Sequence, residues 1–307
     1  MKIKVWGARG SIPTPGAKTM RYGGNTSCVQ VTLSDGSLVV LDAGTGIRTM
    51  GLVLGALQRP VTILLTHLHL DHIQGLMFFA PCFHPDSEIV IWGPASAAGP
   101  ATLGASLLDR IARYISAPLS PVEVRELPCR VSFREAQASQ WRLGPATVHA
   151  HSVSHRGPTL GYRIEDGDTA LAYIPDHEPA LGAPLATLED EWISGLELAR
   201  GADLLIHDAQ YTDAEYPAHL GWGHSSLSDA LTFGARAAAE RMLLFHHEPL
   251  HDDEMLDALA GQARARWQAL GRDPQSVSLA QEGMELLVSG RPRAGATQAT
   301  PPRQAAR

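Results

Sequence analysis

The segment VTILLTHLHLDH, residues 61–72, decides the fold. Its first five residues are apolar or β-branched, which predicts a buried strand. The polar residues begin where this strand ends, and ligand-binding side chains collect at such places. Three imidazoles and a carboxylate are costly to bury unless something binds them, and these donors suit a metal ion. On extended backbone His67 and His69 point the same way, whereas Asp71 and His72 enter the next turn. The segment is therefore predicted to serve two neighbouring metals.

Four later apolar runs also end in His or Asp, which predicts that their side chains meet at one site. These runs are HSVSH at 151–155, YIPD at 173–176, LLIHD at 204–208 and LLFHH at 243–247. One such strand would mean little by itself. Five strands that end on one edge of a layered fold would bring these donors together.

The segment HLHLDH at 67–72 resembles the HxHxDH signature of the metallo-β-lactamase superfamily. Further segments resemble the ribonuclease Z and phosphodiesterase branch of that superfamily: GARGSIP at 7–13, YGGNTSC at 22–28, LDAGTG at 41–46, GYR at 161–163 and GHSS at 223–226. The resemblance covers most of residues 1–290. It implies an α/β (α+β) fold, an αββα sandwich with a two-metal site at the edge between its sheets.

The resemblance also implies a set of metal ligands. One metal would bind His67, His69 and His155, the other Asp71, His72 and His246, and Asp176 would bridge the two. His151 is an alternative to His155, and His247 is an alternative to His246. Zinc is the expected metal, with manganese or iron as alternatives.

Two further acidic or basic positions have a supporting role in this interpretation. Asp42 is expected to be a buried carboxylate that orients the metal-binding loop, although a turn carboxylate is the simpler interpretation. His177, beside Asp176, is either a satisfied core histidine or a support for the ligands.

Two metals that share a water lower its pKa and supply a bridging hydroxide as nucleophile at neutral pH. Asp71 belongs to the catalytic set through this centre. His224 is predicted to give a proton to the leaving oxygen, with Asp208 holding its imidazole and the start of the following helix favouring an anion. The alternative for His224 is a loop histidine that caps the helix.

The predicted function is a metal-dependent phosphodiesterase for a small phosphodiester, such as a cyclic nucleotide or a short nucleotide-like substrate. A ribonuclease Z that processes the 3′ end of tRNA is the alternative. Such enzymes have a basic arm before the bridging Asp, but Asp176 follows His155 by only 21 positions, without a basic run. Residues 1–290 carry 21 Lys and Arg against 32 Asp and Glu, a net charge of −11 that disfavours a large polyanion.

A few basic side chains near the motifs could bind one small phosphate: Arg9, Arg21, Arg156 and Arg163. Two other classes stay open. One is a thioester or lactone hydrolase of the same fold, because the same hydroxide attacks carbonyl carbon. The other is a non-catalytic metal-binding protein.

Residues 1–290 are predicted to form one domain, followed by a disordered tail at 291–307 that is rich in Pro, Ala, Thr and Arg. The stretch 73–145 is the least regular, with one helix expected at 103–115, and is a possible lid or insertion. Further helices are expected at 190–199, 226–241 and 252–270. No apolar run is long enough for a membrane span or a signal peptide, and three cysteines fit a reducing compartment, so a cytoplasmic protein is expected. The resemblance adds a possible homodimer.

Overall fold

The structure, a computed structural model, describes residues 1–96 and 106–290. Its centre is a pair of seven-stranded sheets. The first sheet has the order β14 (Glu285–Leu287), β1 (Lys2–Gly7), β2 (Cys28–Thr32), β3 (Leu38–Leu41), β4 (Val61–Leu64), β5 (Glu88–Pro94), β6 (Arg130–Ala136). The second has the order β13 (Val277–Leu279), β12 (Met242–Phe245), β11 (Leu204–Asp208), β10 (Thr169–Ile174), β9 (Leu160–Asp166), β8 (Ala146–Ser152), β7 (Ser139–Leu143).

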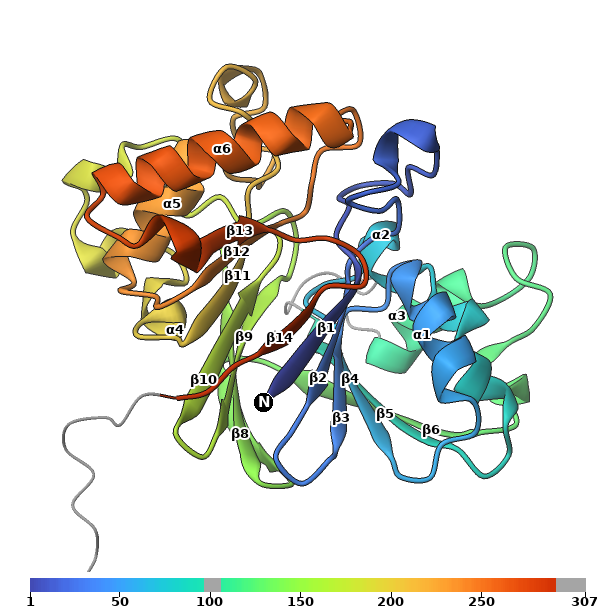
Figure 1. Cartoon of the computed structure of the whole chain (residues 1–307). Helices are drawn as coiled ribbons and strands as arrows, with labels where there is room; N and C mark the ends of the chain where they lie inside the picture. The colour runs from blue at the N-terminus through green and yellow to red at the C-terminus, as the bar shows by residue number, and fades with distance from the viewer. Residues whose placement is uncertain (97–105, 291–307) are drawn as a thin grey trace, which may run out of the picture.

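Helices cover the outer face of each sheet, so the molecule has four layers (Figure 1). The helices are α1 (Gly46–Leu54), α2 (Leu70–Ile73), α3 (Leu107–Tyr114), α4 (Leu196–Ala199), α5 (Leu227–Arg236) and α6 (Asp253–Ala269). Helices α1 and α3 pack on the first sheet, and α4, α5 and α6 pack on the second. The predicted αββα sandwich is confirmed.

Three apolar clusters hold these layers together, and the central one lies between the sheets. It joins Val31 of the first sheet to Tyr162 and Phe245 of the second. Trp267 of α6 and Met50 of α1 are fully buried in the two outer clusters. Because every layer buries an apolar face on its neighbour, the edge of the sandwich is free to carry polar residues.

The predicted helices are correct in part. Ser226 caps α5 by accepting a hydrogen bond from the backbone N–H of Asp229, and Asp252 caps α6 in the same way. Helix α5 ends at Arg236, five residues before the predicted end, and Ala238 has a left-handed φ of 52°. The helix predicted at 190–199 is wrong. Gly195 has a φ of 70°, so only a 3-10 turn at Asp190–Trp192 and the short α4 form there.

The stretch 73–145 is more regular than its sequence suggests. Besides β5 and α3 it contains β6 and β7, which are edge strands of the two sheets. Most side chains of β6 are polar or only partly buried, so they lack the apolar pattern that identifies an inner strand. A role of this stretch as a lid stays a prediction. Residues 103–105 of the expected helix and the predicted tail at 291–307 lie outside the described residues.

The topology gathers the predicted donors at one edge. Strands β3 and β4 are parallel, and so are β10, β11 and β12, so within each sheet their carboxyl ends share an edge. Ligands bind at the carboxyl ends of strands in such sheets. Among the described residues, no helix is both long enough and apolar enough to span a membrane.

Candidate metal centre

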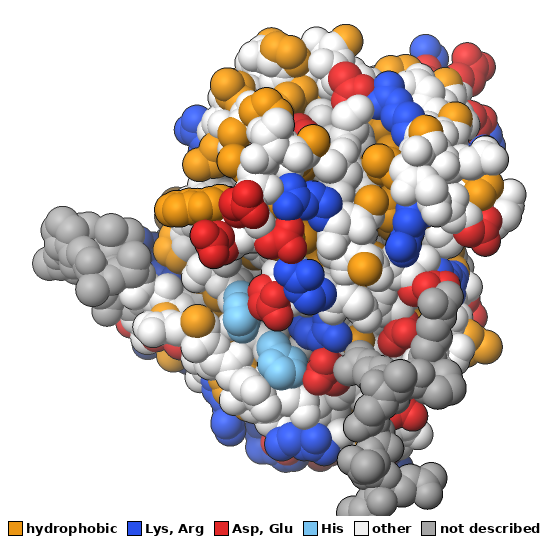
Figure 2. Space-filling view, turned by 90° about the vertical axis from the view of Figure 1, so that its left-hand side faces the viewer, with side chains coloured by type: hydrophobic (Ala, Val, Ile, Leu, Met, Phe, Trp, Pro, Cys, Tyr) orange, Lys and Arg blue, Asp and Glu red, His pale blue; other side chains and the backbone are white. Residues whose placement is uncertain are grey.

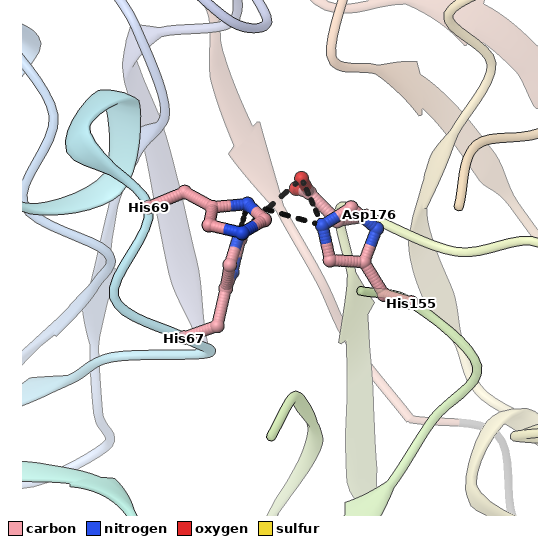
Figure 3. A group of neighbouring side chains, drawn as sticks. All are labelled: His67, His69, His155 and Asp176. Carbon is pink, nitrogen blue, oxygen red and sulfur yellow. Dashed lines mark hydrogen bonds and ion pairs between the residues drawn. The ribbon is translucent and has the colours of Figure 1, made fainter. Parts of the chain in front are cut away.

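The first group of donors consists of three imidazoles and one carboxylate that face a common point (Figure 3). The Nε2 atom of His67 lies 2.8 Å from Nδ1 of His69, and that atom lies 3.2 Å from Nε2 of His155. Asp176 Oδ2 is 3.6 Å from the Nε2 atoms of both His67 and His155. The predicted first ligand set is therefore assembled in space.

Hydrogen bonds on the outer side of two of these rings, those of His155 and His67, turn their lone pairs inward. Nδ1 of His155 donates to the carbonyl oxygen of Gly223 at 2.7 Å, so in the neutral imidazole Nε2 is the atom without a proton. Nδ1 of His67 lies 3.0 Å from the hydroxyl of Thr66. Burial lowers the pKa of His67, His69 and His155, which favours the neutral imidazole that binds metals.

The second group contains Asp71, His72, His246 and again Asp176, and all four are buried. His72 Nε2 lies 3.0 Å from Asp176 Oδ1 and 3.3 Å from Asp71 Oδ2. His246 Nε2 lies 3.2 Å from Asp71 Oδ2 and 3.4 Å from Asp176 Oδ2. Burial lowers the pKa of His246, but Asp176 and Asp71 outweigh it and raise that pKa to about 9. The negative potential in this group favours a cation.

Asp42 holds the metal-binding segment from behind. Its Oδ1 accepts the backbone N–H of Thr66 at 2.7 Å, and its Oδ2 accepts Nδ1 of His72 at 2.8 Å and the hydroxyl of Tyr173 at 2.9 Å. Asp42 is fully buried and has a φ of 58°, an unusual backbone conformation for a non-glycine residue. This geometry matches the predicted orienting carboxylate rather than a turn carboxylate.

His246 is fixed by equally specific contacts. Its Nδ1 lies 3.0 Å from Oε1 of Gln210, whose amide group contacts Glu248 at 2.6 Å. His246 has a φ of 61°, and a Cβ on Gly10 would lie 2.4 Å from its Nδ1, so only glycine fits beside the ring. These contacts direct Nε2 of His246 toward Asp71, whose Oδ2 also accepts a hydrogen bond from the backbone N–H of Ser11 at 2.8 Å.

Asp176 belongs to both groups, which places it where a bridging ligand is expected. Its Oδ1 is buried and lies 3.0 Å from Nε2 of His72, and its Oδ2 lies 3.6 Å from Nε2 of His67. Burial opposes ionisation of Asp176, but His246, His72 and His67 outweigh it and hold the pKa of its carboxyl well below the ordinary value. An ionised, buried carboxylate whose two oxygens face imidazoles of both groups fits two divalent cations. The nitrogen and oxygen donors suit zinc, and also manganese or iron.

His224 and Asp208 form a pair next to both groups. Nδ1 of His224 lies 2.7 Å from Asp208 Oδ2, and Asp208 is fully buried. The ring of His224 lies 4.9 Å from that of His155 and 4.8 Å from that of His246, measured between centroids. The imidazole that sequence analysis assigned to proton transfer therefore lies between the two halves of the centre.

The predicted anion site at the start of α5 is wrong. The first backbone N–H groups of this helix are already bonded inside the protein: Leu227 donates to the carbonyl of Tyr211, Ser228 to Asp213 and Asp229 to the Ser226 hydroxyl. A phosphate would have to displace these partners.

The other candidate histidines lie outside the two groups. His151 is an exposed residue of β8, and His247 is buried with its Nε2 bonded to the carbonyl of Ala280 at 2.8 Å. His177 lies 2.9 Å from His207, and its backbone N–H donates to Asp208 at 2.9 Å. His177 thus supports Asp208 through its main chain, while its ring packs on Phe233.

Three residues that support the donors were not predicted from the sequence: Gln210, Thr66 and Glu178. Gln210 and Glu178 contact residues tens of positions away, so no local motif identifies them. Each does follow a predicted ligand or catalytic residue by two positions, Gln210 after Asp208 and Glu178 after Asp176, which is the signal that was available.

A cavity of about 210 Å³ opens beside the first group. His67, His69, Arg110, Arg156 and Pro158 are among its lining residues. Among the four basic residues named from the sequence, only Arg156 lines it. Arg9 is buried against backbone carbonyls, whereas Arg21 pairs with Asp257 and Arg163 with Glu165.

The neighbouring face of the second sheet has a mixed charge. Ion pairs join His149 and Arg163 to Glu165, and Arg200 to Asp190. Figure 2 shows histidine side chains on this side of the molecule among interspersed acidic and basic side chains. This pattern differs from the basic stripe typical of surfaces that bind long nucleic acids.

Comparison with known proteins places the chain in a family. A ribonuclease Z of Mycobacterium avium (strain 104) is 26% identical over 298 residues, covering 91% of this chain and 98% of that protein. A metallo-beta-lactamase fold protein of Bacillus subtilis, YhfI, superposes with a TM-score of 0.64 at 18% identity and covers 93% of this chain and 98% of its own. The short form of human tRNase Z gives a TM-score of 0.64 at 22% identity, with 94% and 100% covered.

A sequence-family model, that of the beta-lactamase superfamily domain, matches residues 38–247. This range is more than half of the chain and includes every predicted metal ligand. The predicted superfamily and the resemblance to its ribonuclease Z branch are therefore confirmed. The chain belongs to the beta-lactamase superfamily.

Proposed function

We propose that this protein is a metal-dependent phosphodiesterase that hydrolyses a small phosphodiester, such as a cyclic nucleotide or a short nucleotide-like molecule. The observation that carries the proposal is the juxtaposition of two donor groups, joined by Asp176, with the His224–Asp208 pair. Two groups of nitrogen and oxygen donors provide for metal binding, and a separate oriented imidazole provides for proton transfer.

The proposed roles of the residues follow from their geometry. His67, His69 and His155 would hold one cation, Asp71, His72 and His246 the other, and Asp176 both. When bound, two divalent cations supply Lewis acidity and an acidic water for attack on phosphorus.

The protein's own part in proton transfer falls to His224. Asp208 accepts a hydrogen bond from Nδ1 of His224, so the proton that can leave the imidazolium is the one on Nε2. That proton would pass to the leaving oxygen of the ester, and Asp208 would stabilise the positive ring before the transfer.

The preference for a small substrate rests on the surroundings of the centre. The interval between His155 and Asp176 is filled by the β9–β10 hairpin, Leu160–Asp166 and Thr169–Ile174, so it contains no extended arm. The cavity beside the first group has the volume of a small molecule fragment and offers Arg156 for one anionic group.

A ribonuclease Z activity is the second candidate, and the relative from Mycobacterium avium favours it because that protein carries this name and aligns over nearly the whole chain. The two candidates share the centre and the proton donor. They differ in what binds outside the cavity, since a tRNA would need contacts well beyond Arg156.

The test is hydrolysis of bis(p-nitrophenyl) phosphate by protein loaded separately with zinc and manganese. Turnover is expected, together with its loss in Asp71→Ala and a loss of about 10²–10⁴-fold in His224→Ala with both metals retained. Absence of turnover with two metals bound would contradict the proposal and favour a thioester or lactone hydrolase, or a non-catalytic metal-binding protein.

The substrate class is then tested on the active protein. Comparison of kcat/KM for cyclic nucleotides, short RNAs and a precursor tRNA separates the two candidates. A preference for the small substrates supports the proposal, whereas efficient cleavage at the 3′ end of the tRNA favours ribonuclease Z.

A further inference from the structure

We propose that Glu178 is the positioning residue of the first donor group: it fixes the 216–223 loop, and the loop fixes the ring of His155. This inference rests on the proposed metal centre and adds a residue to which neither the sequence motifs nor the ligand sets assign a role. Its consequence is that the cation held by His67, His69 and His155 depends on a loop, whereas the second cation does not.

Glu178 is buried, and both of its carboxylate oxygens are engaged by the loop. Oε1 accepts the hydroxyl of Tyr216 at 2.9 Å and the backbone N–H of Gly221 at 2.9 Å, and Oε2 accepts the backbone N–H of Gly223 at 2.8 Å. Glu178 is 1% exposed, and its bond to Gly223 is fully buried, whereas Tyr216 and Gly221 are in part open to water. Charge-assisted hydrogen bonds of this kind are stronger than neutral ones.

Gly223 passes this constraint to the metal ligand. Its carbonyl accepts Nδ1 of His155 at 2.7 Å, while its N–H is held by Glu178. A Cβ on Gly223 would lie 2.4 Å from Nδ1 of His155, and the φ of this residue is 93°, so glycine is required for the approach. Partners on the outer nitrogen fix the tautomer and the direction of a metal-binding histidine.

The main chain of Glu178 reaches the same ligand from its other side. Its backbone N–H donates to the carbonyl of Ser154, the residue before His155, at 2.9 Å. Glu178 also follows Asp176 by two positions. One residue thus ties together the segments that carry His155, Asp176 and, through Gly223, the neighbouring His224.

The histidines that belong to the second group alone have no such dependence on the loop. His72 is held by Asp42, and His246 is held by Gln210, and neither contact passes through the 216–223 loop. Loosening the loop should therefore weaken the binding of the first cation and leave the binding of the second unchanged.

The experiment measures metal binding by each half alone. Glu178→Gln is made in two backgrounds: Asp71→Ala, which leaves the first group, and His69→Ala, which leaves the second. The dissociation constant for zinc is measured by competition with a chromophoric chelator. We expect Glu178→Gln to weaken zinc binding about 10–100-fold in the Asp71→Ala background. In the His69→Ala background the dissociation constant for zinc should stay unchanged. Equal weakening in both backgrounds, or no weakening in either, would overturn the proposal.

Two further variants control for folding. Glu215 is a carboxylate of the same region that accepts hydrogen bonds from Thr212 and His251 but contacts none of the proposed metal ligands. Glu215→Gln should therefore leave both dissociation constants for zinc unchanged. Tyr216→Phe removes only one bond to Glu178 and should weaken the first site by less than Glu178→Gln does. If Glu178→Gln fails to fold, the proposal stands on a selective effect of Tyr216→Phe and falls if that variant weakens zinc binding at both sites alike.

The dissociation constants for zinc do not depend on catalysis, so a failure of the proposed hydrolysis leaves this test intact.

Discussion

The two halves of the metal centre share Asp176 but are built differently. In the second half, Asp71, His72 and His246 are all buried, and their supports include Asp42 directly after β3 and Gln210 after β11. In the first half, His69 is exposed, and its outer nitrogen has no partner within residues 1–96 and 106–290. His155 is held by a loop carbonyl.

One site thus combines a half held by buried side chains with a half held by a loop, which we call the rigid and the adaptable half. A buried donor with a buried partner loses little order when it binds a cation, because its geometry is already set. A donor on a loop must be fixed by distant contacts, but it leaves space beside it. The cavity lined by His67, His69 and Arg156 lies on this first side. We infer that the second half binds its cation more tightly, and that substrate enters at the first.

Removal of one ligand from each half should have the largest effect. Asp71→Ala and His69→Ala should each reduce the bound metal from two ions to one. Each should also reduce hydrolysis by about 10³-fold or more, since loss of one ion removes several kcal/mol of charge stabilisation. Metal content of dialysed protein and kcat/KM provide the readout. The remaining ion in His69→Ala should have the lower dissociation constant; the reverse order would contradict the inferred asymmetry.

Asp42→Ala tests whether the second half owes its rigidity to one carboxylate. The variant leaves the N–H of Thr66, the ring of His72 and the hydroxyl of Tyr173 buried without their acceptor. We expect unfolding free energy to fall by about 3 kcal/mol or more and the second cation to bind more weakly. Urea denaturation of metal-free protein and zinc titration measure the two effects. A stable variant with native zinc affinity would show that the segment at 66–72 is held by its backbone alone.

The sequence predicted the donors well and their supports poorly. All seven predicted ligands come together, because each follows an apolar strand whose carboxyl end the topology places at one edge. Such strands carry a local pattern. Glu178 and Gln210 act across 45 and 36 residues, so their roles are absent from any short motif. The same reason explains why β6 and β7 were not predicted. A polar edge strand is defined by the strand it pairs with rather than by its own residues.

Gln210→Ala should have a smaller effect, confined to the second half. The variant removes the acceptor of Nδ1 of His246 and frees that ring to rotate. We expect zinc affinity at the second site to fall about 10–100-fold, with the first site unchanged. Titration in the His69→Ala and Asp71→Ala backgrounds separates the sites. Weakening of the first site to the same degree would mean that the two halves are not independently supported.

His151→Ala is the smallest perturbation and decides between the two histidines of the 151–155 segment. His151 is exposed on β8, where it pairs with Gly161, and it lines a different cavity with Asp190 and Arg200. His155 faces Asp176. We therefore expect His151→Ala to keep both zinc constants and to change stability by no more than about 0.5 kcal/mol, whereas His155→Ala loses the first cation. If His151→Ala instead weakened zinc binding at the first site, His151 would be a ligand there. The hydrogen bond from His155 to Gly223 would then not be enough to identify the ligand of the first half.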